Sequence, residues 1–480
     1  MIRAWLERQP ALADLALEGA TLAAVEAARV RHAVSDHEAT WRPGEALRLL
    51  LVGYLGTRNT GADVRVAEMI RQLRWILGED RVDLTALTSD ARLSAGYFPG
   101  VRQLKLPDLY PSFLYSETAK HHGVVACEGS MFKSKFANAL TTLMAGALGM
   151  ANAQNKLSVG YGAEAGSMDA SLRAFVRRTC QGSYVVVRNR ASADVLTGLG
   201  VRSFLGTDTA WTFDPAPPAR ARGLLRDAGW DGEPVLVVCP INPFWWPVRP
   251  KAGRALVDRL RGVTASDHYR SLYYHRFDGD DQGAFERYLD ALAEAVAPYR
   301  EKAFVVLVGM ERLDRRACES LAARLGGAPT FVSDEHTMFD LVAILREARV
   351  LVSSRYHAHV CSMPAGVPAI GVSMDERIAN LLGERGQSEL CLTVDEPFLG
   401  ERLGELLEAL WSDGAAVGAN ARRAVAGHLR RLGEMGIALE DEVLRCYPRF
   451  ERTPRPRSWD AYLPPLTPAL EGLLGEASPA

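Results

Sequence analysis

The 480-residue chain contains little cysteine, and none of it occurs in close pairs. Its seven cysteines are scattered along the sequence, without a single C-x-x-C spacing. This distribution argues against a disulfide framework and against a zinc site, since both depend on cysteines at short, recurring spacings. Dispersed free thiols are typical of a reducing compartment, where cysteine mostly serves as a small buried hydrophobic residue.

The chain also lacks an excess of charge of either sign. It has 56 basic and 58 acidic residues, for a formal net charge of −2, and no long run of one sign. We therefore expect no nucleic-acid partner and no charged interaction tail. A hydrophobic content of 48% with 24% charged residues is the profile of a soluble globular protein.

A long hydrophobic run is missing as well. The most apolar stretch, residues 139–151, contains two glycines and is about a third shorter than a membrane-spanning helix. The first 32 residues carry Asp and Glu among the apolar residues, unlike a signal peptide. These features predict a cytoplasmic protein without an integral membrane segment. No carboxylate–histidine cluster has ligand spacing, so we expect no metal site.

What the sequence does contain is an alternation of apolar strands and helices. Predicted strands cover 47–54, 82–87, 123–127, 156–160, 183–188 and 201–206, and then 235–240, 271–277, 303–309, 330–333, 349–354 and 368–373. Apolar strands separated by helices indicate parallel sheets covered on both faces. The pattern predicts an α/β protein with two Rossmann-like, doubly wound domains.

The domain boundaries follow from breaks in this alternation. We expect a helical preface over 1–46, a first Rossmann-like domain over 47–228, a second over 229–398, and C-terminal helices with a Pro-rich tail over 399–480. Ligands of such sheets bind beyond the carboxyl ends of the strands. The site is therefore expected in the cleft where those ends face each other.

The first strand is followed by a glycine-containing loop. Gly53, Gly56 and Gly61 permit tight turns, and Asn59 or Thr60 can cap the next helix, whose free N–H groups form an anion site. The loop is neither a G-x-G-x-x-G motif nor a P-loop, so a plain strand–helix turn remains an alternative.

Three further strands of the first half end in polar residues. Glu128 and Ser130 follow one strand, Arg188 closes a run of three valines, and Asp208 follows the next strand. Arg188 is expected at the lip of the sheet, as part of a site or as a surface arginine paired with an acid. Glu164 lies in a stretch with three glycines, where the backbone packs closely against a ligand or a helix.

The second half offers an aromatic loop and a cationic turn. Phe244, Trp245 and Trp246 either pack against the other domain or form a platform for a sugar or base. Arg355 has a planar fork suited to carboxylate or phosphate. His357 titrates near neutral pH and points to the same side as Arg355 if the strand continues. A solvated turn with a satisfied histidine is the alternative.

Taken in order, these loops resemble the polysaccharide pyruvyl transferase family over about residues 47 to 385. The strongest element is S-R-x-H followed by a small-residue helix and a G-V-P turn, which matches residues 354–357 and 366–368. Three further elements also match the family: Arg188 with Ser192, Asp208 with its following residues, and the G-x-x-G-x-x-N-x-G of the first loop. Where the family has an acidic pair after N-x-G, this chain has Ala62 and Asp63.

The resemblance implies a fold like the GT-B glycosyltransferases and a reaction without a cofactor. Phosphoenolpyruvate is the implied donor, and its pyruvyl group forms a ketal on a sugar-containing acceptor with release of phosphate. Arg188 and Arg355 would clamp the donor from opposite domains. His357 would be the general acid–base, and Asp208 would orient one of these three groups.

The acceptor side of the site is also implied by the resemblance. Its expected members are Gly56, Asn59, Gly61, Glu128, Ser130 and the aromatic residues Phe244, Trp245 and Trp246. Two other functions stay open: a GT-B glycosyltransferase using a nucleotide sugar, with Glu311 near the ribose, and a non-catalytic ligand-binding protein of the same fold. The sequence leaves the acceptor and the oligomeric state open, a homo-oligomer included.

Overall fold

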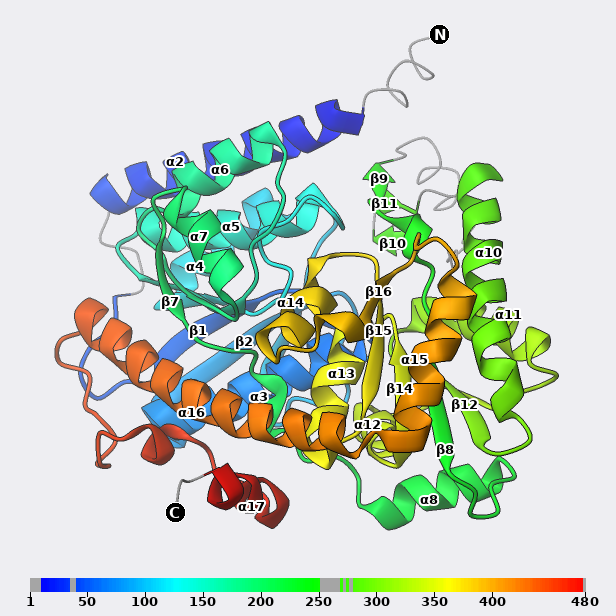
Figure 1. Ribbon diagram of the computed structural model, residues 1–480. Coiled ribbons are helices and arrows are strands. Elements are labelled where there is room, and N and C mark those ends of the chain that lie inside the picture. Colours follow the sequence, from blue (N-terminus) through cyan, green and yellow to red (C-terminus); the bar gives the residue numbers. More distant parts are fainter. Residues whose placement is uncertain (1–9, 35–39, 251–267, 271–272, 276–278, 478–480) are drawn as a thin grey trace, which may run out of the picture.

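The structure is a computed structural model that describes residues 10–34, 40–250, 268–270, 273–275 and 279–477. Its described part contains two large parallel sheets and a small antiparallel one (Figure 1). The predicted strand over 271–277 lies partly outside the described residues. Within it, the structure has only the two-residue strand β11 (Tyr273–Tyr274), paired with β9 (Arg249–Pro250) and β10 (His268–Arg270).

The first sheet has seven parallel strands in the order β3-β2-β1-β4-β5-β6-β7. Their bounds are β1 Leu47–Val52, β2 Val82–Thr88, β3 Arg102–Lys105, β4 Gly123–Ala126, β5 Leu157–Ala163, β6 Tyr184–Val187 and β7 Arg202–Leu205. The central strands are buried on both faces, as their near-continuous Leu and Val runs predict.

The second sheet has six parallel strands in the order β13-β12-β8-β14-β15-β16. Their bounds are β8 Val235–Cys239, β12 Phe304–Gly309, β13 Thr330–Val332, β14 Ala348–Ser353, β15 Ala369–Ser373 and β16 Cys391–Thr393. Both sheets thus follow the 3-2-1-4-5-6 order of doubly wound folds, which confirms the predicted fold class. Each order reverses once, between β1 and β4 and between β8 and β14.

Helices cover both faces of these sheets. They are α2 Pro10–Val34, α3 Thr60–Leu77, α4 Pro111–Lys120, α5 Asn138–Ala153, α6 Ala170–Cys180, α7 Arg190–Thr197, α8 Pro218–Asp227, α10 Gly279–Val296, α11 Arg315–Arg324, α12 Met338–Arg346, α13 Tyr356–Ser362, α14 Glu376–Glu384, α15 Leu399–Asp413, α16 Ala415–Cys446 and α17 Pro468–Ala477. Among the helices described, we find none with both the length and the apolar character needed to span a bilayer.

The apolar stretch at 139–151 forms most of α5, which is buried on nearly all sides. It lies between the first sheet and two outer helices, α2 and α6 (Figure 1). Gly146 allows this close packing, because a Cβ there would collide with the side chain of Thr21 on α2. The hydrophobicity of the stretch is therefore explained by burial within the protein.

Helix α16 connects the two domains. It leaves the second domain beside the turn at Gly366 and runs along the first domain, where Met435 packs against Gly206 (Figure 1). The C-terminal segment then folds back onto α16, with the backbone of Trp459 lying against Gly433. The region after the second sheet is thus part of the packing of the first domain.

Two glycines of α16 provide a test of this packing. We expect Gly433→Ala to lower stability by about 1–3 kcal/mol, since its Cβ would collide with the carbonyl oxygen of Trp459. Gly427→Ala, on the same helix with open space around it, should instead gain up to about 1 kcal/mol from helix propensity. Differential scanning calorimetry of both variants measures this. Equal shifts for both would contradict the described docking of the C-terminal segment.

Candidate active site

The loops predicted to carry chemistry converge between the two sheets. Four of them follow β1, β4, β8 and β14, the strands on either side of the two points where strand order reverses, and those with Arg188 and Asp208 follow β6 and β7. Helix α3, which follows β1, lies against α13, which follows β14 (Figure 1). The candidate site is therefore built from both domains.

Direct hydrogen bonds and ion pairs join the two domains at this place. The backbone N–H of Thr60 donates to the carbonyl of Met310 at 2.8 Å. The hydroxyl of Tyr54 donates to Glu311 at 3.0 Å. Lys133 of the first domain forms an ion pair of 3.1 Å with Glu376, at the start of α14 in the second. These contacts hold the carboxyl ends of the strands together.

Asp208 lies at the centre of the first domain's part of the site and is fully buried. Its carboxylate pairs with Arg65 at 3.0 Å and with Arg188 at 2.9 Å, and it accepts the backbone N–H of Ala210 at 3.1 Å. Burial acts to raise the pKa of Asp208, but Arg65, His357 and Arg188 together hold it well below its usual range. Asp208 is therefore an anion at neutral pH.

Arg188 is more deeply buried than the sequence predicts. Its guanidinium pairs with Asp208 and with Glu164, to which Nε donates at 2.7 Å, and it lies 4.1 Å from the ring centroid of Tyr356. Arg188 directly follows β6 and pairs with acids, but the expected surface exposure is wrong, because two buried carboxylates hold its head group inside. In this structure the two arginines form no open clamp.

Arg355 lies at the start of α13 and pairs with two acids of its own domain. Its Nε donates to Asp314 at 2.8 Å, and its Nη2 lies 2.9 Å from Glu311. Burial raises the pKa of Asp314 to about 6, although Arg355 opposes this. With 18% of its side chain exposed, Arg355 is more accessible than Arg188, at 2%.

His357 does not point to the same side as Arg355. The strand ends at Ser353 and α13 begins at Tyr356, so the two side chains diverge and His357 turns toward the first domain. Its Nε2 lies 3.5 Å from Oδ2 of Asp208 and makes no hydrogen bond to any residue in the described part of the chain. Burial lowers the pKa of His357 despite the neighbouring Asp208, which favours the neutral imidazole.

Gly61 explains why the first loop needs a glycine at this place. A Cβ at residue 61 would collide with the imidazole of His357, including its Nδ1 atom. The glycine of the N-x-G pattern thus makes room for a histidine of the other domain. Gly56 has a different role: its φ of +71° and its closeness to Thr88 show a tight turn.

The start of α3 does not offer the free N–H groups that we predicted. Asn59 is the N-cap residue and accepts the N–H of Ala62 at 3.1 Å, while the N–H of Thr60 is taken by Met310. The prediction of an open anion site at this helix end is therefore wrong. Asn59 and its neighbours form part of the contact between the domains.

A group of carboxyl side chains borders Arg355. Burial raises the pKa of Asp63 well above its usual range, and nearby Glu311 and Glu128 raise it further. Glu128 accepts the N–H of Ser130 at 3.3 Å, and its other oxygen is buried with no partner among the described residues. In the part of the chain that the structure describes, no group of His, Cys, Asp or Glu is arranged to hold a metal ion.

One side chain of the aromatic loop is buried in the interior, and the other two line a cavity. Trp245 is buried and stacks on His275, with ring centroids 4.6 Å apart, so its predicted role in a binding platform is wrong. Phe244 and Trp246 line a cavity of about 490 Å³ together with Lys135 of the first domain and with residues after β15 and β16. Among the latter are Asp375 and Glu376.

Two site residues were not recognised in the sequence. Arg65 is fully buried in α3, where its guanidinium also donates to the carbonyls of Cys127 and Gly162. A charged residue at a helix position surrounded by apolar ones is the signal for it. Lys133 is the second of these residues: it is buried between Glu164 and Glu376, at 3.1 Å from each.

The two parallel sheets and the buried charges where their strand ends meet define a two-domain α/β protein of GT-B-like class. A family model described as polysaccharide pyruvyl transferase matches residues 108–376, which is more than half of the chain. The chain belongs to the polysaccharide pyruvyl transferase family, and the protein is a transferase. No curated protein matches significantly.

Solved structures similar to this chain are distant from it in sequence. The UDP-GlcNAc 2-epimerase from Methanocaldococcus jannaschii is 12% identical, with 76% of this chain and 93% of that chain covered and a TM-score of 0.48. The UDP-GlcNAc 2-epimerase from Neisseria meningitidis is 10% identical, with 78% of this chain and 94% of that chain covered and a TM-score of 0.47. The ADP-heptose LPS heptosyltransferase II of E. coli is 11% identical, with 77% of this chain and 99% of that chain covered and a TM-score of 0.37.

The buried charges predict a large effect of Asp208→Asn on stability. Removing the carboxylate leaves Arg65 and Arg188 undercompensated in the interior, which should cost about 3–5 kcal/mol. Because the folded-state pKa of Asp208 is depressed, its stabilising effect is present above the unfolded pKa of about 3.9 and is lost as pH falls toward the folded value.

Thermal denaturation between pH 3 and 8 tests this prediction. Asp208→Asn should lower the transition temperature at pH 7 and show a flatter acid limb than the natural protein. Asp231→Asn, an exposed position, should change the stability by less than about 0.5 kcal/mol. A variant at residue 208 as stable as the control would show that Asp208 does not hold this site together.

Proposed function

We propose that the protein transfers the pyruvyl group of phosphoenolpyruvate to two hydroxyls of a sugar-containing acceptor, forming a ketal and releasing phosphate. The observation that carries this proposal is the presence, after β14, of a partly exposed arginine, Arg355, and of His357, whose imidazole faces buried Asp208 and whose lowered pKa favours its neutral form. The reaction needs no cofactor, because the enol phosphate is already an activated donor.

The donor carries a carboxylate and a phosphate, and Arg355 is suited to one of them. Its planar guanidinium can form two parallel hydrogen bonds to either group. Of its two present partners, Asp314 has the raised pKa of about 6, so its protonation frees the guanidinium for an incoming anion. Arg188, with its head group held by Glu164 and Asp208, acts in this proposal as a positioning residue.

The chemical step places specific demands on His357. One acceptor hydroxyl adds to C2 of the donor, its proton is passed to C3, and the C2–C3 double bond becomes a single bond. A second hydroxyl then displaces phosphate from C2, and its proton leaves with the phosphate. Two C–O bonds thus form at C2 and the bond to the phosphate oxygen breaks. A neutral His357 can accept the proton of the attacking hydroxyl, and Asp208, 3.5 Å from Nε2, stabilises the resulting imidazolium.

The acceptor is proposed to occupy the cavity beside the aromatic loop. Phe244 and Trp246 offer apolar ring faces, and the nearby carboxylates of Asp375 and Glu376 can accept hydrogen bonds from sugar hydroxyls. Lys135 lines the cavity from the first domain. This combination of flat apolar surface and hydrogen-bond acceptors suits a sugar.

The donor assignment predicts different defects for Arg355 and His357. Arg355→Ala should lose binding of phosphoenolpyruvate in calorimetric titration, because the anion loses its guanidinium partner. His357→Gln should bind the donor within a few-fold of the natural affinity while kcat for phosphate release falls about 10²–10⁴-fold. Arg226→Ala, an exposed arginine on α8, is the matched control and should bind normally.

Titrations with UDP and GDP separate this function from its rival. Nucleotide binding without phosphoenolpyruvate binding would favour a glycosyltransferase that uses a nucleotide sugar. Near-normal turnover by Arg355→Ala would contradict the proposed donor site.

The acceptor assignment predicts a selective effect of the aromatic side chains. Phe244→Ala and Trp246→Ala should raise the acceptor KM about tenfold, in line with the loss of 1–3 kcal/mol of stacking and apolar contact, and leave the Kd for phosphoenolpyruvate unchanged. The acceptor is the sugar glycoside that supports phosphate release in a screen. Phe398→Ala, at a side chain 78% exposed, is the control. Unchanged acceptor KM in both cavity variants would place the acceptor elsewhere.

A further inference from the structure

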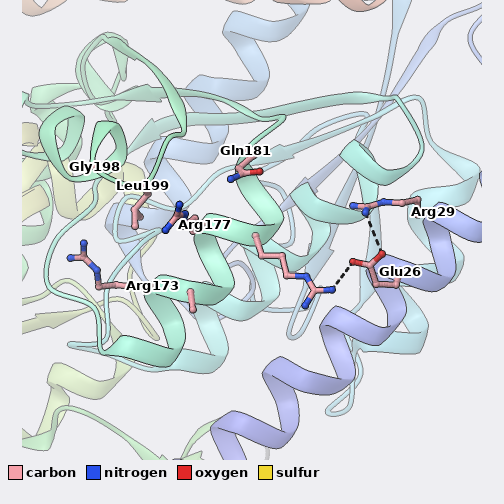
Figure 2. A pocket seen from close by; sticks show the side chains of 9 residues that line it. Glu26, Arg29, Arg173, Arg177, Gln181, Gly198 and Leu199 are labelled. Carbon is pink, nitrogen blue, oxygen red and sulfur yellow. Dashed lines mark hydrogen bonds and ion pairs between the residues drawn. The ribbon is translucent and has the colours of Figure 1, made fainter.

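A second cavity lies on the outer side of the first domain, between α2 and α6. Its volume is about 710 Å³, and Figure 2 shows the residues that line it. Four arginines line it, namely Arg29 on α2 and Arg173, Arg177 and Arg178 on α6, against a single carboxylate, Glu26. This leaves a formal excess of three positive charges around one hollow.

The protein itself neutralises little of this charge. Glu26 is shared between Arg29, at 3.3 Å, and Arg178, at 3.0 Å. The guanidinium groups of Arg173 and Arg177 form neither an ion pair nor a hydrogen bond with any described residue, and both are exposed. These two are four residues apart on one helix, an arrangement in which like charges repel. Within the described part of the chain, Arg29 and Arg178 share one carboxylate, and Arg173 and Arg177 have no compensating contact.

The outer face of α2, beside these arginines, is apolar. Leu12, Leu15, Val30 and Val34 are 41%, 46%, 62% and 77% exposed, and they make up four of the eight large hydrophobic side chains that are exposed in the described chain. Exposed small residues lie between them: Ala16, Gly19, Ala20, Ala23 and Ala27. Asp14 and Glu18 lie away from this face, half-buried and buried, while half-buried Glu26 lies at its edge, where it pairs with Arg29 and Arg178.

An apolar stripe next to unpaired arginines fits one kind of partner well. We propose that α2 and the arginine cluster form a docking surface for a membrane that contains anionic lipids. The apolar side chains would enter the boundary between headgroups and acyl chains, while the arginines contact the lipid phosphates. Docking of this kind needs no helix that crosses the bilayer.

Charge complementarity favours a membrane over a second copy of the chain. In a two-fold symmetric dimer the same patch meets itself, so an interface across α2 would bring two unneutralised arginine clusters toward each other. A lipid surface offers the opposite charge and an apolar layer at once. The proposal is independent of the reaction in the cleft.

Sedimentation of the full chain with lipid vesicles tests the proposal. Vesicles of phosphatidylcholine with 30% phosphatidylglycerol should bind the protein at 0.1 M NaCl, and pure phosphatidylcholine vesicles should bind it at least tenfold more weakly. Raising the salt to 0.5 M should release most of the bound protein, because the arginine–phosphate attraction is screened.

Charge-reversal variants identify the surface. Arg173→Glu with Arg177→Glu should weaken binding at least about 25-fold, given roughly fivefold for each arginine lost at an anionic surface. Arg226→Glu with Arg423→Glu changes the net charge equally on α8 and α16, away from α2 (Figure 1), and should bind as the natural protein does. Val30→Ser with Val34→Ser should weaken binding with the arginines intact.

Several results would overturn the proposal. One is equal binding of the protein to both vesicle types. Another is undiminished vesicle binding by the Arg173→Glu, Arg177→Glu variant. Calorimetric binding of inorganic pyrophosphate without vesicle binding would make the cavity a site for a free anion. A dimer in analytical ultracentrifugation that Val30→Ser with Val34→Ser dissociates, again without vesicle binding, would assign the surface to a second copy. The variants change exposed positions only, and circular dichroism confirms their folding.

Discussion

The carboxylate of Asp208, buried between two arginines, is the interaction on which the candidate site depends. A fully buried anion is tolerated only when cations and hydrogen-bond donors replace its water, and here Arg65, Arg188 and the N–H of Ala210 do so. Because Arg65 comes from α3 and Arg188 from the end of β6, the pairing fixes both elements against the loop after β7. It also places a permanent negative charge under His357 of the other domain.

From this centre, two sets of paired charges extend across the cleft. One runs from Arg188 through Glu164 and Lys133 to Glu376 of the second domain. The other set, Arg355 with its two acids, is joined to the first domain by the hydroxyl of Tyr54. His357 lies between the two sets. The arginines and the lysine of both sets are thus neutralised by carboxylates within the protein. Arg355 and His357 keep 18% and 13% of their side chains exposed.

Much of the architecture follows from patterns that are local in sequence. Near-continuous apolar runs are typical of buried parallel strands. The runs of β6 and β12 therefore predict the two sheets. The meeting of Arg188, Asp208 and His357 could also be anticipated, since each follows a strand and strand ends of such sheets converge. In the structure Asp208 joins them: it forms an ion pair with Arg188 and lies 3.5 Å from His357.

What the sequence could not show was the direction of individual side chains. Arg355 and His357 were expected on one side because a strand alternates with period two, but α13 starts between them and turns the histidine away. Asn59 does cap α3, yet the neighbouring N–H is taken by a carbonyl more than 200 residues later in the chain, which no local pattern encodes. Trp245 and Trp246 are adjacent and chemically alike, and both rings contact His275, yet only Trp245 is buried. Such outcomes depend on the three-dimensional packing, and for the N–H of Thr60 on a contact between the domains.

Arginine has two opposite uses in this chain, and a net charge of −2 conceals both. In the cleft, arginines are buried and matched by carboxylates, so they contribute shape and rigidity and little external field. On α6, Arg173 and Arg177 are exposed and unmatched, so their field reaches into solvent over about a Debye length. Composition averages over these two situations. An anionic surface responds only to the local excess, which is why a chain with slightly more acidic than basic residues can still present a face that attracts negative charge. The apolar stripe of α2 lies next to that excess, and the adjacency of the two, rather than either alone, gives the surface its specificity for a lipid interface.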